Sequence, residues 1–132
     1  MFKSISKIST IPTLVFFLAG CQNYEFPKPP YSKVETLSVT DLSAGGVTFR
    51  GNFIRLGDTA EIIDHGFVWG FGEHVTQEGN SEGTLDLGTA SFNGEFQGNV
   101  VSGLQNDTTY YVKAFVVTSA YKVYGAPVTF RK

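Results

Sequence analysis

Alternation of apolar and polar positions dominates most of the chain. Leu37 and Val39 alternate with serine and threonine, and after the turn sequence SAGG the apolar positions are Val47, Phe49 and Phe53. A period of two places successive side chains on opposite faces of a strand. Each run therefore predicts a strand with one face in a hydrophobic core.

The segment 64–71 predicts the next strand, with one face of large side chains and one face rich in glycine. The first face carries His65, Phe67, Trp69 and Phe71. Because a strand of this kind buries its alternate large residues, we expect Phe67 and Trp69 in the core. In the alternative, the same two rings face outward and form a platform on which sugars stack.

The remaining part of the chain, residues 72–132, adds further strand signals separated by turns. These are a polar, Gly-rich loop at 72–83, a short edge strand at 85–87, a tight turn at Asn93-Gly94, a strand at 95–104 and two long runs at 108–119 and 122–130. About seven short strands with frequent turn signals predict an all-β fold, an antiparallel β-sandwich.

Composition agrees with strands and argues against nucleic acid as a partner. Glycine is abundant at 15 residues and aromatic residues make up 14% of the chain. Ten Lys and Arg residues are set against 12 Asp and Glu residues. Such a mild balance forms neither a basic surface for nucleic acid nor an acidic tail.

The first 20 residues predict a secretory signal peptide. Two lysines precede an apolar run at 11–18, which is too short to span a bilayer. The run ends in Leu18-Ala19-Gly20-Cys21, which resembles the bacterial lipobox, where the lipoprotein pathway cleaves before the cysteine and acylates it. We therefore expect residues 1–20 to be removed and Cys21 to carry lipid.

Cys21 is the only cysteine, so an exported chain has no internal disulfide to form with it. Two or three acyl chains, at about 0.8 kcal/mol for each buried methylene, would anchor the protein stably to a membrane. In the alternative, Cys21 is a buried free thiol. Residues 21–33 contain three prolines and predict a semi-rigid tether. The expected location is the bacterial outer membrane or cell surface, with the periplasmic face left open.

The sequence LQNDTTYYVKAF at 104–115 resembles the E–F corner and strand F of fibronectin type III domains found in lipoproteins of the Bacteroidetes. GFVWG at 66–70 and YGAPVTF at 124–130 are similar to two other strands of that family. The resemblance implies a fibronectin type III-like sandwich over residues 34–132. It also implies that Tyr110, together with Leu104, forms a tyrosine corner, in which the ring is buried and the hydroxyl bonds upstream backbone.

The tyrosine corner also predicts which residues of this strand face outward. If Tyr110 faces the core, alternation leaves an apolar outer face, and the following loop adds another ring. This candidate binding patch consists of Tyr111, Phe115, Val117 and Tyr121, and it suits a partner protein or a glycan. In the alternative, the rings only cover bare glycine backbone on the neighbouring strand.

Catalytic and metal-binding motifs are missing from the sequence. His65 and His74 are nine residues apart, but neither an HExxH motif nor paired Cys/His spacing accompanies them. We interpret both histidines as solvated, and we interpret the acidic residues Glu73, Glu78, Glu82 and Asp86 as a solvated loop rather than a calcium site. The expectation is a protein without catalytic activity, cofactor or metal.

Two short motifs suggest modification. Asp58-Thr59-Ala60 and Asp107-Thr108-Thr109 both resemble the D-[ST]-x sites of the Bacteroidetes protein O-glycosylation system, and both fall in predicted turns. Thr59 and Thr108 are therefore candidate O-glycosylation sites.

These patterns favour a lipid-anchored binding or adhesion module for a glycan or a partner protein. The alternative is a structural spacer, or an accessory subunit of an outer-membrane or fimbrial complex, with no ligand of its own. Exposure separates the two hypotheses. Solvent-exposed rings at Tyr111, Phe115 and Tyr121 favour binding, whereas buried rings favour the spacer.

Overall fold

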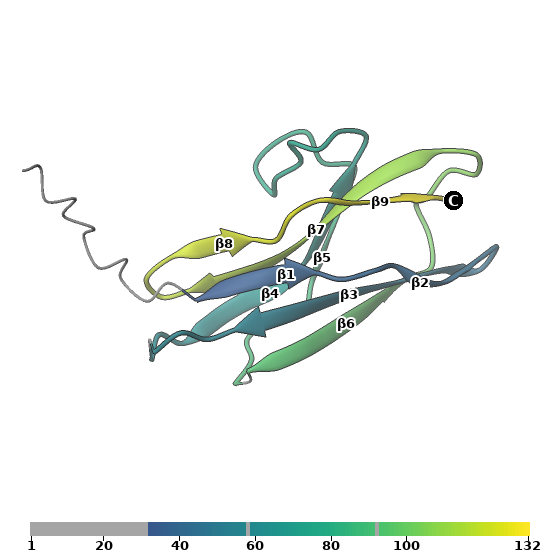
Figure 1. Ribbon diagram of the computed structural model, residues 1–132. Helices are drawn as coiled ribbons and strands as arrows, with labels where there is room; N and C mark the ends of the chain where they lie inside the picture. Colours follow the sequence, from purple (N-terminus) through teal and green to yellow (C-terminus); the bar gives the residue numbers. More distant parts are fainter. Residues whose placement is uncertain (1–31, 58, 92) are drawn as a thin grey trace, which may run out of the picture.

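Two antiparallel sheets make up the fold, which is an all-β sandwich (Figure 1). The computed structural model describes residues 32–57, 59–91 and 93–132. The predicted signal peptide at 1–20, Cys21 and nearly all of the tether at 21–33 lie outside these residues. Within them, no helix is long and apolar enough to cross a membrane.

The first sheet is organised around one long central strand. Its members are β1 (Lys33–Thr36), β2 (Thr40–Ser43), β3 (Gly46–Ile54) and β6 (Gly94–Val100). β1 and β2 pair with β3, and so does β6, in every case antiparallel. β6 lies at the margin of this sheet (Figure 1).

The second sheet has two long strands at its centre. Its members are β4 (Ile62–Gly70), β5 (Gly83–Asp86), β7 (Thr109–Thr118), β8 (Lys122–Tyr124) and β9 (Val128–Arg131). β4 pairs with β7, β5 pairs with the outer side of β4, and β8 and β9 both pair with β7.

The described residues form nine strands, rather than about seven. The first predicted strand, around Leu37 and Val39, is placed wrongly, because these residues lie in the gap between β1 and β2. Within β2, Asp41 adopts a left-handed φ of 53° and the pairing with β3 changes register. The last run divides between β8 and β9. Pro127 lies in that gap and cannot donate to a ladder because it has no backbone N–H.

The core lies between the sheets and is mainly aromatic. Phe67 and Trp69 are both buried in it, so the prediction for these two residues is confirmed. The ring of Phe49 lies 5.6 Å from that of Phe67 and 5.4 Å from that of Trp69, and the tilted contacts join the two sheets. Phe71, predicted on the same face, lies beyond the end of β4 and is 52% exposed.

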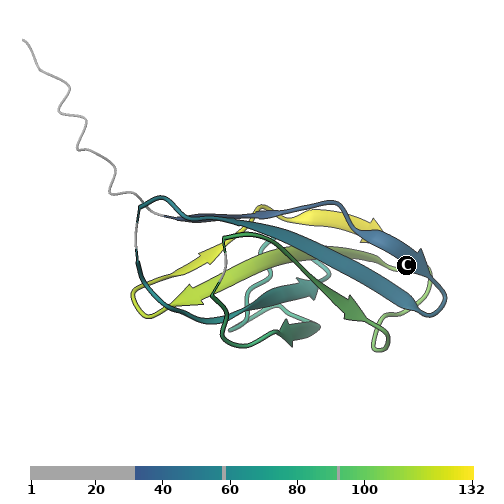
Figure 2. The same cartoon turned by 90° about the horizontal axis from the view of Figure 1, so that it is seen from below.

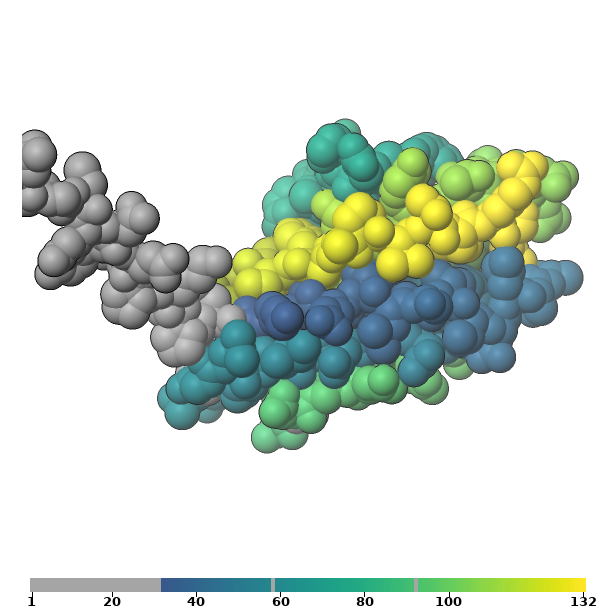
Figure 3. All heavy atoms as spheres, in the orientation of Figure 1, coloured from purple at the N-terminus to yellow at the C-terminus, as the bar shows by residue number. Residues whose placement is uncertain are grey.

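The two long sides of the sandwich differ. One is closed, because the side-chain oxygen of Thr36 in β1 accepts a hydrogen bond of 2.9 Å from the backbone of Ala114 in β7. Figure 3 shows residues of β8 and β9 lying directly against those of β1 and β2 on this side. The other side is open between β5 and β6, and there Leu85 and Leu87 lie half-buried at the edge of the core.

Candidate functional site

The candidate binding patch on β7 does not form an exposed surface. Phe115 is completely buried, so the prediction that it faces solvent is wrong. Tyr111, Val117 and Tyr121 are half-buried. Phe115 does point away from the main core, as its position in the strand requires, but it packs with Val68 and Val75 in a second small core.

The second core exists because residues 71–82, hereafter the cover loop, fold back over the outer face of the second sheet. Figure 1 shows this loop standing on the side of the second sheet that faces away from the first. Val75 is its buried anchor. The loop approaches so closely that a Cβ at Gly70 would lie 2.4 Å from the backbone oxygen of Asn80. Glycine on the outer face of β4 therefore makes room for the loop.

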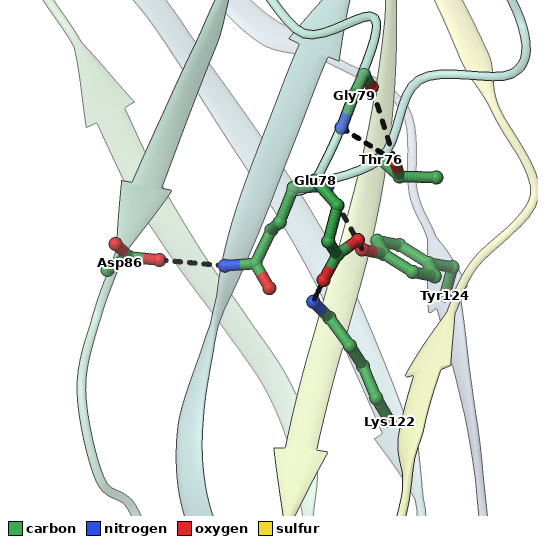
Figure 4. A network of polar contacts seen from close by, with 7 residues as sticks. Thr76, Glu78, Gly79, Asp86, Lys122 and Tyr124 are labelled. Carbon is green, nitrogen blue, oxygen red and sulfur yellow. Dashed lines mark hydrogen bonds and ion pairs between the residues drawn. The ribbon is translucent and has the colours of Figure 1, made fainter.

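Polar contacts fasten the cover loop to β8 (Figure 4). The backbone N–H of Gln77 donates to the Tyr124 hydroxyl at 3.0 Å, and that hydroxyl donates to a carboxylate oxygen of Glu78 at 3.3 Å. The ammonium group of Lys122 forms an ion pair with the other carboxylate oxygen of Glu78 and lies over the Tyr124 ring. We call Gln77, Glu78, Lys122 and Tyr124 the clasp.

The clasp changes the acidity of its charged members. The hydrogen bond from Lys122 is the main reason that the pKa of Glu78 is lowered. Burial alone would lower the pKa of Lys122, but hydrogen bonds with Glu78 and Tyr124 outweigh it, and the pKa is raised. Both shifts favour the charged forms, so the ion pair persists at neutral pH.

A second electrostatic pair lies beside the clasp. Partial loss of solvent and the nearby carboxylate of Asp64 raise the pKa of Asp86, while a hydrogen bond of 3.1 Å from the Gln77 side chain opposes the rise. The described residues contain no group of three or more side chains able to hold a metal ion. The two carboxylates repel each other when both are charged.

His65 is buried, so its interpretation as a solvated histidine is wrong. Its Nδ1 atom lies 2.7 Å from the backbone oxygen of Gly88, which can only accept, so Nδ1 carries the proton. The ring also meets Phe96 edge-on at 5.2 Å. His74, by contrast, is strongly exposed. His65 therefore connects β4 to the loop after β5 and packs in the core.

Tyr110 has the geometry that the tyrosine corner implies. Its ring is buried and stacks on that of Phe130 at 5.4 Å. Its hydroxyl accepts a 2.8 Å hydrogen bond from the backbone N–H of Gln105, five residues upstream. Leu104 packs against the main core. The pair therefore fixes the turn that leads into β7.

An open cleft lies at the end of the sandwich where three loops meet. The backbone N–H of Arg55 donates to the side chain of Asn93, and the backbone N–H of Ser119 donates to the backbone oxygen of Glu61. The space between the loop that carries Arg55 and the loop that carries Asn93 has a volume of about 870 Å³. We call it the loop-end cleft. Its described lining consists of Arg55, Thr59, Ala60, Glu61, Ile62, Ile63, Thr89, Ala90, Ser91 and Asn93.

The lining of the loop-end cleft is mixed in character. Ile63 is 49% exposed, which is unusual for a large apolar side chain. The guanidinium of Arg55 lies 5.3 Å from the centre of the Phe53 ring and donates to the backbone oxygen of Ala60 at 2.9 Å. The cleft therefore combines apolar surface with positioned polar groups.

The two candidate O-glycosylation sites both lie in loops. Thr59 is exposed and lines the loop-end cleft. Thr108 is half-buried, and its hydroxyl donates to the backbone oxygen of Asn106 at 3.1 Å. Modification of either residue stays a prediction.

Comparisons with known proteins give a likeness in fold. No protein-family model matches the chain, and no curated protein matches it either. Among solved structures, the chain is similar to a DUF3823 family protein from Bacteroides ovatus, with a TM-score of 0.64 and 22% sequence identity. The match covers 76% of this chain and 55% of that one, so this chain spans little more than half of its neighbour's length. An identity this low supports the shared fold alone.

Proposed function

We propose that this chain is a lipid-anchored, non-catalytic binding module of the fibronectin type III-like kind on a bacterial envelope, and that it holds a partner protein in the loop-end cleft. The observation that carries the proposal is the cleft itself, an open space of about 870 Å³ whose described lining comes from the segments between β3 and β4 and between β5 and β6, and from the start of β4. Binding pockets in proteins commonly have volumes of roughly 300–1,000 Å³.

The cleft is a better candidate than the outer face of the second sheet. Phe115, the centre of the predicted patch, is sealed beneath the cover loop by Val75. A ligand that bound there would first have to remove that loop and break the clasp. The loop-end cleft requires no such opening.

A partner protein fits the described lining of the cleft. Protein interfaces have an apolar core, are enriched in arginine and place polar residues at the rim. The exposed Ile63, together with Arg55 and the polar residues around them, reproduces this combination.

The entry point of the chain supports a partner close to the membrane. Ser32, the first described residue, is buried, and its hydroxyl accepts a 3.1 Å hydrogen bond from the backbone N–H of Leu56. Ser32 therefore lies beside the segment that carries Arg55, a residue of the loop-end cleft. If Cys21 is lipidated, only residues 21–31 separate the lipid from this end of the domain, which favours a partner in the envelope.

Photo-crosslinking in the native envelope tests the cleft. A photoreactive residue at position 63 should join the chain to a distinct protein, and the same residue at Leu42 should not. Leu42 is a matched control, because it is apolar, it is 47% exposed against 49% for Ile63, and it lies in β2, which pairs with the end of β3 far from the cleft. Position 63 yielding no protein adduct would refute the proposal, and a carbohydrate adduct there would show that the partner class is wrong.

The anchor needs its own test. Cys21→Ser should move the protein from the membrane fraction to the soluble fraction, because the lipid attachment atom is lost. Cleft variants such as Ile63→Asp should stay in the membrane fraction. A Cys21→Ser protein that still sediments with membranes would contradict lipidation.

The spacer is the second candidate, and one observation favours it. The burial of Phe115 under the cover loop is the outcome that separates a spacer from a module that binds through its strand face. A spacer predicts that neither position 63 nor position 42 yields an adduct with another protein. The same crosslinking experiment therefore decides between the two functions.

A further inference from the structure

β6 is an edge strand along its whole length. It pairs with β3 over seven consecutive residues without a change of register, from Val47 opposite Val100 to Phe53 opposite Gly94. Within the described residues, no strand pairs with its other side. In Figure 2, seen from the side on which β6 lies, the green strand runs along the open side of the sandwich with no strand in front of it.

The backbone groups on the free side of β6 follow from the pairing. The backbone N–H of Leu37 donates to the backbone oxygen of Arg50 at 2.9 Å, so the backbone groups of Arg50 point away from β6. Gln97 lies opposite Arg50 and does not exchange ladder hydrogen bonds with it. The N–H and C=O groups of Gln97 therefore point to the free edge, and those of Glu95 and Asn99 do the same by alternation.

The side chains of this edge are held away from the free backbone. Glu95 pairs with Arg50 at 3.1 Å, and Asn99 accepts a 2.7 Å hydrogen bond from the hydroxyl of Thr48. Both partners lie on β3, on the outer face of the first sheet. The free backbone groups are consequently left accessible to another strand.

β6 also lacks the features that protect the other edges. β2 is broken by a register shift near Asp41, the β8–β9 edge contains Pro127, and β5 has only four residues. Proteins commonly block sheet edges with proline, lysine, bulges or short strands. β6 has no proline, no lysine and no bulge.

Apolar surface lies next to this edge. Leu85 packs on β6 so closely that its Cδ2 atom would be 2.5 Å from a Cβ at Gly98, and Leu87 lies beside it. Both leucines remain half-exposed at the open side of the sandwich. A strand added beside β6 would shield them from water.

We propose that β6 pairs antiparallel with β6 of a second copy of this chain, about a two-fold axis at Gln97. The edge is complementary to itself in this register. Gln97 faces the partner's Gln97 and Glu95 faces the partner's Asn99, so no like charges oppose each other, and each facing pair exchanges both backbone hydrogen bonds. This joins two four-stranded sheets into one continuous sheet with isologous symmetry.

Cysteine crosslinking of the full-length chain in the envelope tests this register. In Gln97→Cys the two thiols face each other with Cα atoms about 5.5 Å apart, which suits a disulfide. In Asn99→Cys each thiol faces the partner's Glu95, and the two thiols are offset by about 13 Å along the strands. Both side chains are exposed, but Asn99→Cys also removes the hydrogen bond from the Thr48 hydroxyl, so the stability of each variant is measured separately. The unmodified chain reports any crosslinking through Cys21.

We expect mild oxidation to convert the Gln97→Cys variant into a disulfide-linked dimer of twice the monomer mass. A reductant should convert this dimer back to monomer. Asn99→Cys should stay at the level of the unmodified chain. The proposal is overturned if Gln97→Cys remains monomeric, if it couples only to a different protein, or if Asn99→Cys dimerises as readily. Urea unfolding of both variants with midpoints near that of the unmodified chain shows that a negative result does not come from misfolding.

Discussion

The substitution Val75→Ala tests whether the cover loop unfolds cooperatively with the rest of the sandwich. Val75 has no exposed surface and packs against Val68 and Phe115. Removing two buried carbon atoms costs about 0.8 kcal/mol each in lost transfer free energy, or about 1.6 kcal/mol. The cavity left behind adds to this loss. We therefore expect the free energy of unfolding to fall by about 2–3 kcal/mol.

Urea unfolding followed by the fluorescence of Trp69 measures this change. The chain has only one tryptophan, and it lies in the main core, so its signal reports unfolding of the whole sandwich. The matched control is Val101→Ala, at a position that is 75% exposed, where we expect a change within about 0.5 kcal/mol. If the two variants unfold at the same urea concentration, the cover loop is not part of the cooperative unit and Phe115 is accessible after all.

Three further changes have defined outcomes. Gly66→Ala should lower the free energy of unfolding by more than about 2 kcal/mol, which appears as a much lower urea midpoint. The reason is that its Cβ would lie 1.8 Å from a backbone oxygen of β5, at a φ of 156°. Tyr110→Phe should cost about 1–2 kcal/mol, because it leaves a buried backbone N–H unpaired; an unchanged midpoint would show that this hydrogen bond contributes nothing. For Asp86 the raised pKa favours the folded state only at low pH, and this contribution is lost as pH rises through the folded pKa. Asp86→Asn should therefore gain stability relative to the unmodified chain between pH 3 and pH 7, and parallel pH profiles of the two proteins would argue against repulsion by Asp64.

The alternation of side chains made most of the sandwich predictable. Phe67 and Trp69 are buried because period two fixes which face of β4 meets the opposite sheet. The same alternation placed His65 on that buried face. The prediction that His65 is solvated did not take into account that it shares a face of the strand with Phe67 and Trp69. Its burial beside Phe96 follows from that shared face.

The burial of the candidate binding patch could not be predicted from the sequence of β7 alone. Alternation correctly turned Phe115 away from the main core, but its burial depends on a loop about 40 residues earlier in the sequence. That loop is polar and Gly-rich, and the only local signals were one valine, Val75, and a glycine at position 70 on the strand beneath it. Contacts of this range arise from tertiary packing and leave little trace in a local pattern.

The alternation of apolar and polar residues did not predict the loop-end cleft either. Its lining comes from segments around Arg55, Ile63 and Asn93, which the chain brings together only when both sheets have formed. The sequence did predict turns there, and it predicted Thr59 in one of them. It contained no signal for an open space between them.

Photo-crosslinking at positions 63 and 111 in the same native envelope tests the central claim most directly. Ile63 lies in the open cleft, whereas Tyr111 belongs to the strand face on which the cover loop packs. The account predicts an adduct with a partner protein from position 63 and none from position 111. An adduct from position 111 without one from position 63 would contradict it, because the strand face would then be the binding surface.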